Sequence, residues 1–493
     1  MLSHLISFIP EIGLVGLAFL LLLLDMLDIQ EDRIFWLCCI GLGTLFIVVL
    51  GLPLAYQAGS FASYRNTHDT WLWKLFFILV TFATTVLSRT YFEPTTNARG
   101  ALQKPGAFLS LLLLCAAGML VIVSSHDLLT FYLGLELATL PLYALSAFQF
   151  NDGPSVEAGS KFVIMGGFSS ALLLFGISFL YGVSGGLGFD GLNPASHVQT
   201  LQPLFWCGIV FILAGIGFKL AMAPLHMWAP DVYEGAPTPI MAFLSVGSKA
   251  AAIAALVTLF FGPLDSIRPQ LSGFFSIAAV GSMVIGNLGA IKQTNLRRFI
   301  AYSSIAQVGY MLLGMLGESE ASRIALQYNL LTYGFTSFAF YFVISLACKN
   351  KLETISSLRG LHTRQRLLAV LVLLCMFSFA GIPPLAGFLG KFLLFSTIAS
   401  KGHYTLLAVA VLNAVVSFYY YILIVKEVYV SDDALSKELK LSGELKVGST
   451  KSASQIILLT PFQNFFVWIF ILGLIVLGTC PVVFNWLSLR SGN

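Results

Sequence analysis

The sequence predicts an all-α polytopic membrane protein with about fourteen transmembrane helices. Of its 493 residues, 57% are hydrophobic and only 10% are charged, whereas soluble domains carry about 25% charged residues. Apolar runs of the roughly 20 residues needed to cross a hydrocarbon core recur along the whole chain. Backbone in lipid must satisfy its own hydrogen bonds, so we expect these runs to be helices.

Fourteen such runs can be marked, and all but two of the connections between them are short. The longer connections cover residues 184–202 and 430–460, the second of which alternates charges and is typical of a solvated loop. The expected helices span residues 5–28, 34–57, 71–88, 107–125, 128–150, 160–183, 203–225, 240–261, 272–291, 300–317, 324–348, 366–400, 402–429 and 461–488. We therefore expect a single membrane domain over residues 1–493, without a soluble domain.

The distribution of Lys and Arg predicts the orientation. Loops after the odd-numbered helices hold 18 of the 27 Lys and Arg residues, and the opposite side holds 5. Because positive loops stay on the cytoplasmic side, both termini are expected outside. The first helix lacks a basic segment and a small-residue cleavage site, so we expect it to be retained.

No motif for a metal, redox cofactor or nucleotide is visible. The seven cysteines lie within or at the ends of apolar runs without Cys-x-x-Cys or Cys/His spacing, and small buried side chains are the expected role. Neither a GxGxxG nor a GxxxxGK[ST] fingerprint is present. The net charge of +4 on so long a chain does not indicate nucleic-acid binding. We expect no metal and no cofactor in this chain.

Four ionisable side chains fall near the middle of apolar runs: Glu136, Lys219, Lys249 and Lys391. Each unpaired charge at the centre of a bilayer costs roughly 2.5–3.5 kcal/mol on insertion scales, so stray charges there are rare and usually functional. A fifth residue, Lys74, lies near its helix start beside two tryptophans and is expected to extend to the interface. One carboxylate with three buried lysines is typical of a proton relay.

The chemistry of such a relay requires groups whose charge changes at moderate cost. Burial disfavours the charged form of a lysine, and a nearby carboxylate favours it. Making and breaking a contact between Glu136 and Lys219 would therefore change the proton affinity of the lysine. In this interpretation Lys249 relays the proton and Lys391 exchanges it toward the far side. The alternative is that these residues only hold helices together, each lysine being satisfied by a carboxylate or by free carbonyls.

Prolines interrupt two of the expected helices. In the seventh, Pro224 follows Lys219 by five residues, and in the twelfth Pro383 and Pro384 precede Lys391. Prolines inside a helix remove backbone donors and free carbonyls, which is tolerated where protein or water satisfies them. Paired interrupted helices that run in opposite directions indicate an inverted-repeat transport site.

Other polar residues have open roles. His226, at the cytoplasmic end of the seventh helix, is either a proton-uptake residue or merely packed. Asp231 and Glu234 are expected to cap helices or order the loop, and His126 and Asp127 are expected in a solvated outer turn. The tyrosines at 419–421 are interpreted as core or interface aromatics rather than a quinone site.

Four segments carry a resemblance to a known family. The chain resembles the antiporter-like subunits of NADH–quinone oxidoreductase, respiratory complex I, and among them the subunit N type, to which mitochondrial subunit 2 belongs. The resemblance covers helices four to thirteen, whereas the ends match in length and hydropathy only. It rests on FYLGLELATLPLYAL (131–145), GFKLAMAPLHMWAPDVYEGAPTPIMAFLSVGSKA (217–250), QTNLRRFIAYSSIAQVGYML (293–312) and FAGIPPLAGFLGKF (379–392).

The resemblance implies an inverted repeat of helices four to eight and nine to thirteen, with helices seven and twelve broken. Its boundaries would be N-terminal helices at 1–106, a first repeat at 107–261, a second at 272–429 and a C-terminal helix at 461–488. It also implies a proton path through the four buried charges. Sibling subunits tend to place a carboxylate where this chain has Lys391. Many relatives have a histidine where this chain has Gln307, so the link between Lys249 and Lys391 is expected to depend more on water here.

The sequence thus predicts a non-redox, proton-translocating membrane subunit, driven by electron transfer from NADH to quinone in other subunits. The resemblance implies partners: sibling antiporter-like and small membrane subunits, with FMN and Fe–S clusters elsewhere in the complex. It also implies a location in a bacterial inner (plasma) membrane or a mitochondrial inner membrane. A subunit of a multisubunit cation/proton antiporter is the rival interpretation, and a structural scaffold is a weaker one. The electron donor stays open between NADH, reduced ferredoxin and an F420-type carrier.

Overall fold

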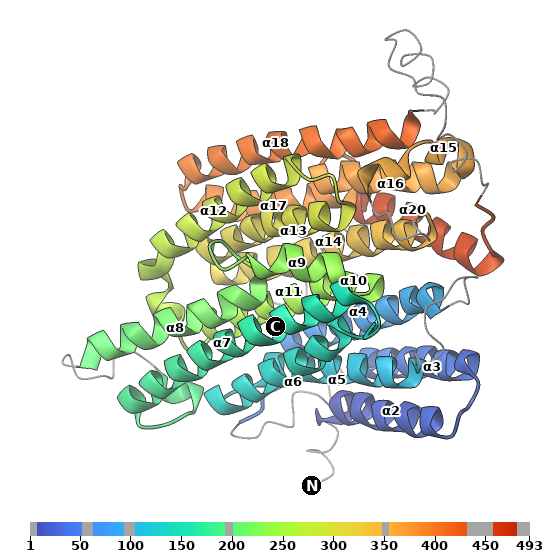
Figure 1. Cartoon of the computed structure of the whole chain (residues 1–493). Helices are drawn as coiled ribbons and strands as arrows, with labels where there is room; N and C mark the ends of the chain where they lie inside the picture. The colour runs from blue at the N-terminus through green and yellow to red at the C-terminus, as the bar shows by residue number, and fades with distance from the viewer. Residues whose placement is uncertain are drawn as a thin grey trace.

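The computed structural model describes residues 7–51, 63–92, 104–192, 201–347, 354–430 and 457–480. Within these residues the regular elements are helices, and they run side by side through the molecule (Figure 1). Thirteen are long and apolar enough to cross a membrane, and a pair of shorter apolar helices, Arg366–Ala380 and Ala386–Ser400, forms a further broken span. This arrangement confirms the expected fold class, because each candidate span and the broken pair fall on one of the fourteen predicted runs.

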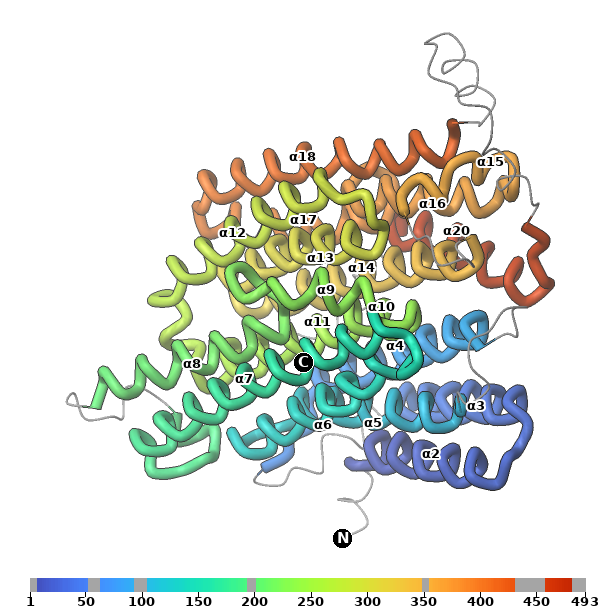
Figure 2. Tube along the Cα trace, in the orientation of Figure 1, coloured from blue at the N-terminus to red at the C-terminus, as the bar shows by residue number. Residues whose placement is uncertain are grey.

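From α2 to α18 the elements run broadly from one edge of the bundle to the other, and α20 packs back against α14, α16 and α17 (Figure 2). The helices are α2 Ile9–Met26, α3 Glu31–Gly51, α4 His68–Phe92, α5 Pro105–Ser124, α6 Leu128–Ser146, α7 Gly153–Ser184, α8 Gln202–Leu220, α9 Trp228–Gly235, α10 Thr238–Phe243, η5 Leu244–Ser248, α11 Lys249–Phe260, α12 Ser272–Ile291, α13 Leu296–Leu313, α14 Ser319–Ala347, α15 Leu361–Arg364, α16 Arg366–Ala380, α17 Ala386–Ser400, α18 Tyr404–Tyr429 and α20 Pro461–Thr479; short 3₁₀ turns are η2 Phe189–Leu192, η6 Asp265–Leu271, η7 Gly314–Leu316 and η8 Ile355–Leu358.

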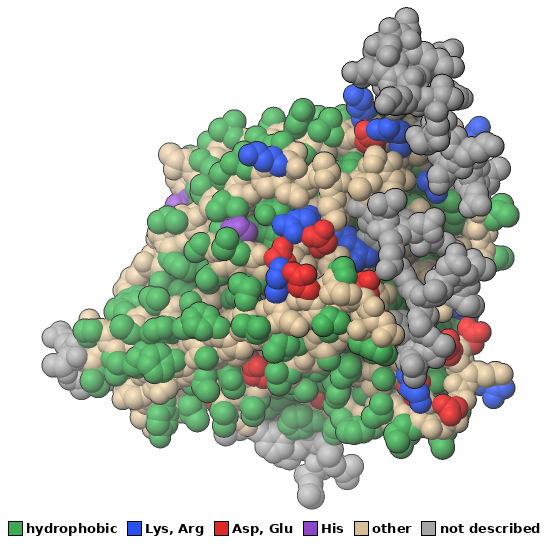
Figure 3. Space-filling model, in the orientation of Figure 1, with side chains coloured by type: hydrophobic (Ala, Val, Ile, Leu, Met, Phe, Trp, Pro, Cys, Tyr) green, Lys and Arg blue, Asp and Glu red, His purple; other side chains and the backbone are tan. Residues whose placement is uncertain are grey.

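The exposed side of the bundle suits lipid. Hydrophobic side chains cover much of the face in Figure 3; one group of charged side chains gathers over α9, and others lie toward the right-hand side of the view. Large apolar side chains such as Ile164, Ile277 and Leu412 are more than half exposed. In contrast, the helix Thr238–Phe260 is fully enclosed by its neighbours. The polar chemistry of the chain is therefore concentrated around a central set of helices.

Two halves of the chain repeat the same local structure. Helices α6 and α13 begin after Asp127 and Asn295, whose side chains accept hydrogen bonds from backbone N–H groups of the first turn. Each of these capping residues also forms an isolated antiparallel bridge, Asp127 to Gly188 and Asn295 to Thr354. A 3₁₀ turn follows each bridge, η2 in the first half and η8 in the second. No residue-level repeat is visible in the sequence, but the caps and bridges reveal one.

The same spacing recurs where helices touch. A Cβ on Gly118 would lie 2.3 Å from the backbone N of Ala138, and one on Gly286 would lie 2.4 Å from the backbone N of Ala306. Gly286 follows Gly118 in the sequence by the same number of residues by which Asn295 follows Asp127. The same separation relates Ala306 to Ala138. Glycine is required at both contacts because any side chain would hold the helix backbones apart. The α5–α6 and α12–α13 contacts are thus equivalent in the two halves.

Both predicted breaks are present. Helix α8 ends at Leu220, five residues earlier than the predicted boundary, because Ala221 adopts the left-handed conformation with φ of 57°. Helix α16 ends at Ala380, followed by Gly381 with φ of 87°. A left-handed residue after the last helical residue stops the hydrogen-bond ladder. Each break is followed by a Pro-Leu pair before the chain becomes helical again.

Three expectations from the sequence need correction. Lys74 does not extend to the interface: it is fully buried, and its Nζ lies 2.7 Å from Oε1 of Glu11. Asp127 is not merely solvated, since it caps α6. Of the six described cysteines, Cys207 and Cys480 are exposed rather than buried. Cys348 and most of the 430–460 connection lie outside the described residues.

The α12–α13 contact leads to a first prediction. Gly286→Ala should destabilise the protein by about 1–3 kcal/mol, because the added methyl group overlaps the backbone of α13. Gly273→Ala in the same helix is the matched control, since a Cβ there has nothing within 4 Å. It should be neutral or stabilise by at most about 1 kcal/mol. The thermal unfolding midpoint in detergent measures both, and equal midpoints would contradict the close contact.

Candidate functional site: a row of buried charges

Glu136 and Lys219 meet, as the sequence predicted. Glu136 lies in the middle of α6, and Lys219 lies in the last turn of α8, two residues before the break. The lysine Nζ is 3.4 Å from Oε1 of Glu136, and it donates a hydrogen bond of 3.1 Å to Oγ1 of Thr139. Ser170 of α7 donates a hydrogen bond of 2.6 Å to the same carboxylate oxygen.

The pair is held where water is scarce. The side chains of Lys219 and Glu136 are 4% and 14% exposed. At the end of α8 the unpaired carbonyls carry the negative end of the helix dipole, which favours a cation there. The break therefore does two things for Lys219: it ends the helix beside the ammonium group, and it leaves the side chain free to reach α6.

Lys249 has no carboxylate beside it within the described residues. Its Nζ donates a hydrogen bond of 2.6 Å to Oγ of Ser304 on α13, and it lies 5.8 Å from the ring centre of Tyr233. The lysine directly follows the π-helical segment η5. Such bulges in an α-helix often mark functional positions because they change the direction of the following side chain. The sequence contains no signal for this bulge that hydropathy or proline content could reveal.

Lys391 is held by the second break. Its Nζ donates hydrogen bonds to the carbonyl oxygens of Phe379, at 2.7 Å, and Ala380, at 3.5 Å. These carbonyls belong to the last turn of α16 and have no acceptor role within that helix. The ring centre of Tyr310 lies 4.5 Å from the same nitrogen and adds a cation–π contact.

Gln307 and Tyr421 occupy the space between Lys249 and Lys391. The Gln307 amide donates to the Phe379 carbonyl, at 3.3 Å, and thus shares an acceptor with Lys391. It also donates at 3.3 Å to the hydroxyl of Tyr421. That hydroxyl is 2.6 Å from Oγ of Ser303, the neighbour of the residue that binds Lys249. Tyr421 was interpreted as a core aromatic, and burial confirms this, but its hydroxyl is also part of the polar chain.

A small cavity adjoins this row of hydrogen-bonded side chains. Its volume of about 10 Å³ is at the lower limit for one water molecule. Residues with hydroxyl groups from three helices, α13, α14 and α18, line it: Ser303, Tyr333, Ser337, Tyr341 and Tyr421. A water there would have the several polar partners that a buried water needs.

The two broken-helix lysines are not equivalent in the repeat. Lys219 precedes the left-handed residue of its break, whereas Lys391 follows Gly381. In the first break, the residue that follows Ala221 at the same separation as Lys391 follows Gly381 is Asp231. Ser304 follows Glu136 by the same number of residues by which the capping residue Asn295 follows Asp127, so Glu136 and Ser304 occupy matched positions in the two halves. The two halves thus present different chemistry at matched positions, a carboxylate in one and a hydroxyl in the other.

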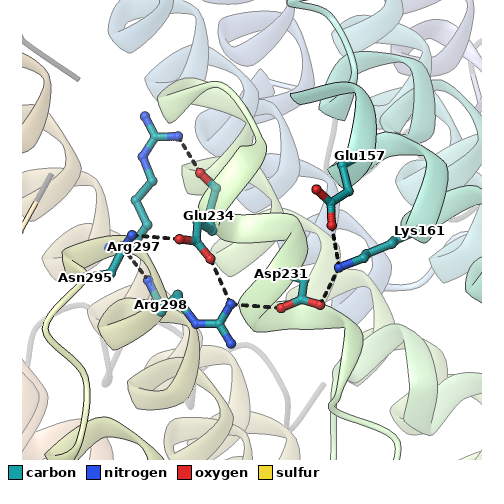
Figure 4. Close-up of polar contacts among 7 residues, drawn as sticks. All are labelled: Glu157, Lys161, Asp231, Glu234, Asn295, Arg297 and Arg298. Carbon is teal, nitrogen blue, oxygen red and sulfur yellow. Dashed lines mark hydrogen bonds and ion pairs between the residues drawn. The ribbon is translucent and has the colours of Figure 1, made fainter. Parts of the chain in front are cut away.

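Asp231 belongs to a charged cluster that joins the two halves (Figure 4). Its carboxylate is 2.9 Å from Nζ of Lys161 on α7 and 2.9 Å from Arg298 on α13. Arg298 also lies 2.8 Å from Glu234, and Glu157 lies 2.8 Å from Lys161. The expectation that Asp231 and Glu234 order this connection is confirmed, through ion pairs rather than caps.

The electrostatics of this connection can be stated for the groups outside the spans. Burial alone would raise the pKa of Asp231, but the hydrogen bonds from Lys161 and Arg298 outweigh it and lower this pKa. Burial lowers the pKa of His226, which follows the break of α8. His226 is half-buried. Within the described residues no group of His, Cys, Asp and Glu side chains could hold a metal.

Comparison with known proteins decides the family. Residues 125–417 match the family model described as NADH:quinone oxidoreductase/Mrp antiporter, TM. NADH-quinone oxidoreductase subunit N of Moorella thermoacetica is 38% identical and covers 92% of this chain and 96% of its own length. The corresponding protein of Nitrosomonas europaea is 34% identical, with coverage of 92% and 95%. The chain belongs to the subunit N family of NADH-quinone oxidoreductase.

Solved structures agree with this assignment. A chain of respiratory complex I from Thermus thermophilus has a TM-score of 0.78 at 28% identity, over 97% of this chain and 99% of that one. A chain of the Mrp complex from Dietzia sp. DQ12-45-1b has a TM-score of 0.82 at 20% identity, over 99% and 96%. The second likeness shows a shared fold alone. Membership of the subunit N family confirms the expected function, that of a proton-translocating membrane subunit working with other subunits of NADH-quinone oxidoreductase.

The cluster around Asp231 leads to a second prediction. Asp231→Asn should lower stability by about 1 kcal/mol, as for partly exposed ion pairs, because it weakens contacts from α9 to both α7 and α13. The control Glu157→Gln removes a pair within α7 only and should cost less, about 0.3–0.5 kcal/mol. Thermal unfolding midpoints in detergent measure the difference, and a larger loss for the control would contradict the bridging role.

The lowered pKa of Asp231 also predicts a pH dependence. Its contribution to stability is present above about pH 4, the ordinary value for aspartate, and is lost as pH falls through the lowered folded-state pKa. The thermal midpoint of the wild type should therefore approach that of Asp231→Asn in acid. A constant gap between the two proteins at every pH would contradict this.

Proposed function

We propose that this subunit N family member moves protons outward through Glu136, Lys219, Lys249 and Lys391, without redox chemistry of its own. The observation that carries the proposal is the buried Glu136–Lys219 pair at the end of a broken helix. In NADH-quinone oxidoreductase, FMN and Fe–S clusters would belong to partner subunits, and the antiporter-like siblings and small membrane subunits would be the neighbours in the membrane.

The pair is suited to act as a switch. At 3.4 Å and an effective dielectric of about 20, the attraction between the two charges is about 5 kcal/mol. Burial opposes the charge on Lys219, and this attraction favours it, so separating the pair favours loss of the proton. The hydroxyls of Ser170 and Thr139 hold the pair without neutralising it. A small movement of α8 at its break would be sufficient to change the distance.

The second half supplies acceptors rather than a counter-charge. Lys249 donates to a hydroxyl and Lys391 to backbone carbonyls, so neither lysine has a carboxylate partner among the described residues that would fix its proton. Gln307 cannot carry a proton at neutral pH, but it donates a hydrogen bond to Tyr421, which lines the adjoining cavity and can orient a water there. We infer that a proton passes from Lys249 to Lys391 along this hydrated line.

The repeated caps, bridges and breaks support a first repeat at 107–261 and a second at 272–429, with helices before and after them at 1–106 and 461–488. The Lys and Arg distribution supports an inner-membrane orientation with both termini outside. On that orientation His226 and the cluster around Asp231 face the cytoplasmic or matrix side, where His226 would take up protons.

The rival proposal is a cation/proton antiporter subunit. The likeness to the Mrp complex chain, at 20% identity, supports the common fold only. The relatives named subunit N are 34–38% identical over most of the chain and favour NADH-quinone oxidoreductase. Pumping that depends on sodium ions would favour the antiporter instead.

The switch leads to a third prediction. Glu136→Gln and Lys219→Ala should each lower proton pumping at least tenfold, since proton transfer by a positioned group contributes about 10²–10⁴-fold to a rate. The assay measures protons moved per NADH oxidised by the complete complex in proteoliposomes.

The controls for this experiment remove the same charges at exposed positions. Glu318→Gln and Lys292→Ala change residues at the ends of spans that the structure shows exposed. Both should leave the ratio of protons to NADH unchanged. Normal pumping by both Glu136→Gln and Lys219→Ala, in a complex that has assembled, would refute the proposed switch.

A further inference from the structure

A second buried carboxylate–lysine pair lies among the N-terminal helices, outside the matched family region. Lys74 on α4 is fully buried, and Glu11 on α2 is 7% exposed. Their charged groups lie 2.7 Å apart, closer than those of Glu136 and Lys219. The pair therefore places two charges deep in the protein at a point where the four-residue relay does not need them.

Polar side chains surround the pair almost completely. Lys74 donates hydrogen bonds to the Tyr64 hydroxyl, at 2.6 Å, and to Oδ1 of Asn66, at 3.0 Å. Tyr64 in turn donates to Oε1 of Glu11, at 2.7 Å, and Ser124 donates to Asn66. The other carboxylate oxygen, Oε2 of Glu11, is buried and accepts no hydrogen bond from any described residue. An oxygen of this kind is costly to bury unless a proton or water occupies it.

A short extended segment separates this pair from a large open cavity. Burial alternates along residues 63–67, with Tyr64 and Asn66 buried and Arg65 and Thr67 exposed. Tyr64 pairs with Ser125 in an isolated antiparallel bridge, so the segment is extended and successive side chains point to opposite faces. The inward face of the segment binds the ion pair, and its outward face lines the cavity.

The cavity is polar and has a volume of about 630 Å³. Besides Arg65 and Thr67, its wall includes Ser125 and the ion pair between Asp69 and Arg323. His126 and Asp190, whose charged groups lie 3.5 Å apart, complete the titratable groups on the wall. The Lys and Arg distribution places this end of the bundle outside, so the cavity opens toward the side to which protons are delivered.

Helix α4 also reaches the proposed path. It packs against α10 and the π-helical segment η5, which ends directly before Lys249. A Cβ on Gly247 of η5 would touch the side chain of Val80 on α4. Two turns from Lys74, on the same face of α4, the hydroxyl of Thr81 is fully buried. One helix thus connects the surroundings of Lys249 with those of the Glu11–Lys74 pair.

The alternative role for the Glu11–Lys74 pair is purely structural: it would attach α2 to the rest of the bundle, which is called fastening below. That role does not require charge, because apolar side chains of similar volume often hold helices as well as a buried ion pair does. Helix α2 is already attached to α5 by another contact. Asp25 at the end of α2 accepts hydrogen bonds from the backbone N–H groups of Gly106 and Ala107, both at 3.2 Å. Fastening does not explain the cavity, nor the buried Glu11 oxygen to which no described residue donates a hydrogen bond.

We propose that Glu11 and Lys74 form a second proton-holding pair, which releases protons into the outward cavity beside residues 63–67. This inference rests on the proposed function. In the resting pair the carboxylate is ionised and the ammonium is protonated. A proton arriving from the path binds Oε2 of Glu11 and gives a neutral acid beside the charged lysine. Transfer of that proton to water in the cavity restores the ion pair, so one proton enters and one leaves.

The test uses the complete complex in proteoliposomes and compares protons moved per NADH oxidised. The double variant Glu11→Leu/Lys74→Met removes both charges, keeps similar volumes and leaves no unpaired charge. Glu11→Gln keeps hydrogen-bonding capacity but cannot take up a proton, and it serves where the double variant does not assemble. Asp25→Ala is the matched control, since it weakens the attachment of α2 without touching the pair. We expect the ratio to fall at least twofold in the first two variants and to stay unchanged in the control.

Two outcomes would overturn the inference. One is an unchanged ratio in an assembled complex carrying the double variant or Glu11→Gln. The other is an equal fall in Asp25→Ala, which would make the pair a fastening of α2. Glu136→Gln in the same assay separates this inference from the proposed function. If Glu136→Gln lowers the ratio and the Glu11 variants do not, only the second pair is refuted; if none lowers it, the proposed function fails as well.

Discussion

The rest of this structure depends on the need to provide every charge inside the bundle with a partner other than bulk water. An unpaired charge in a low-dielectric medium costs several kcal/mol, so each lysine must be met by a dipole or an opposite charge. The chain does this in three ways: Lys74 and Lys219 have carboxylates, Lys249 has a hydroxyl, and Lys391 has backbone carbonyls. Because these partners differ in charge, the lysines differ in how strongly their protons are held, as the proposed relay requires.

The broken helices follow from the same constraint. A continuous helix uses nearly all of its carbonyls internally, so it has none to offer a buried ammonium group. Ending α16 at Ala380 frees the carbonyls that bind Lys391, and ending α8 at Leu220 brings its last-turn lysine to Glu136. The two breaks share a backbone geometry, but their lysines lie on opposite sides of it. A repeated scaffold therefore supports two different kinds of site.

Much of the fold could be predicted because hydropathy and proline act locally. Fourteen apolar runs gave fourteen spans, and the prolines marked both breaks. The prediction was wrong for Lys74, because a sequence cannot say that a lysine near a helix end faces Glu11 across the bundle rather than solvent. The bulge before Lys249 and the hydroxyl link through Tyr421 were also missed, since both depend on contacts between distant segments.

By itself, the sequence determined that this is a membrane protein of many helices, that four charges lie within its apolar runs and that two helices are interrupted. These features depend on the composition of single segments, which fixes their preference for lipid and their capacity for backbone hydrogen bonds. The tertiary structure alone decided which charge meets which partner, how the halves repeat and where a second ion pair adjoins an open cavity. Electrostatic partners act over a few ångströms, and only helix packing brings residues from distant segments that close.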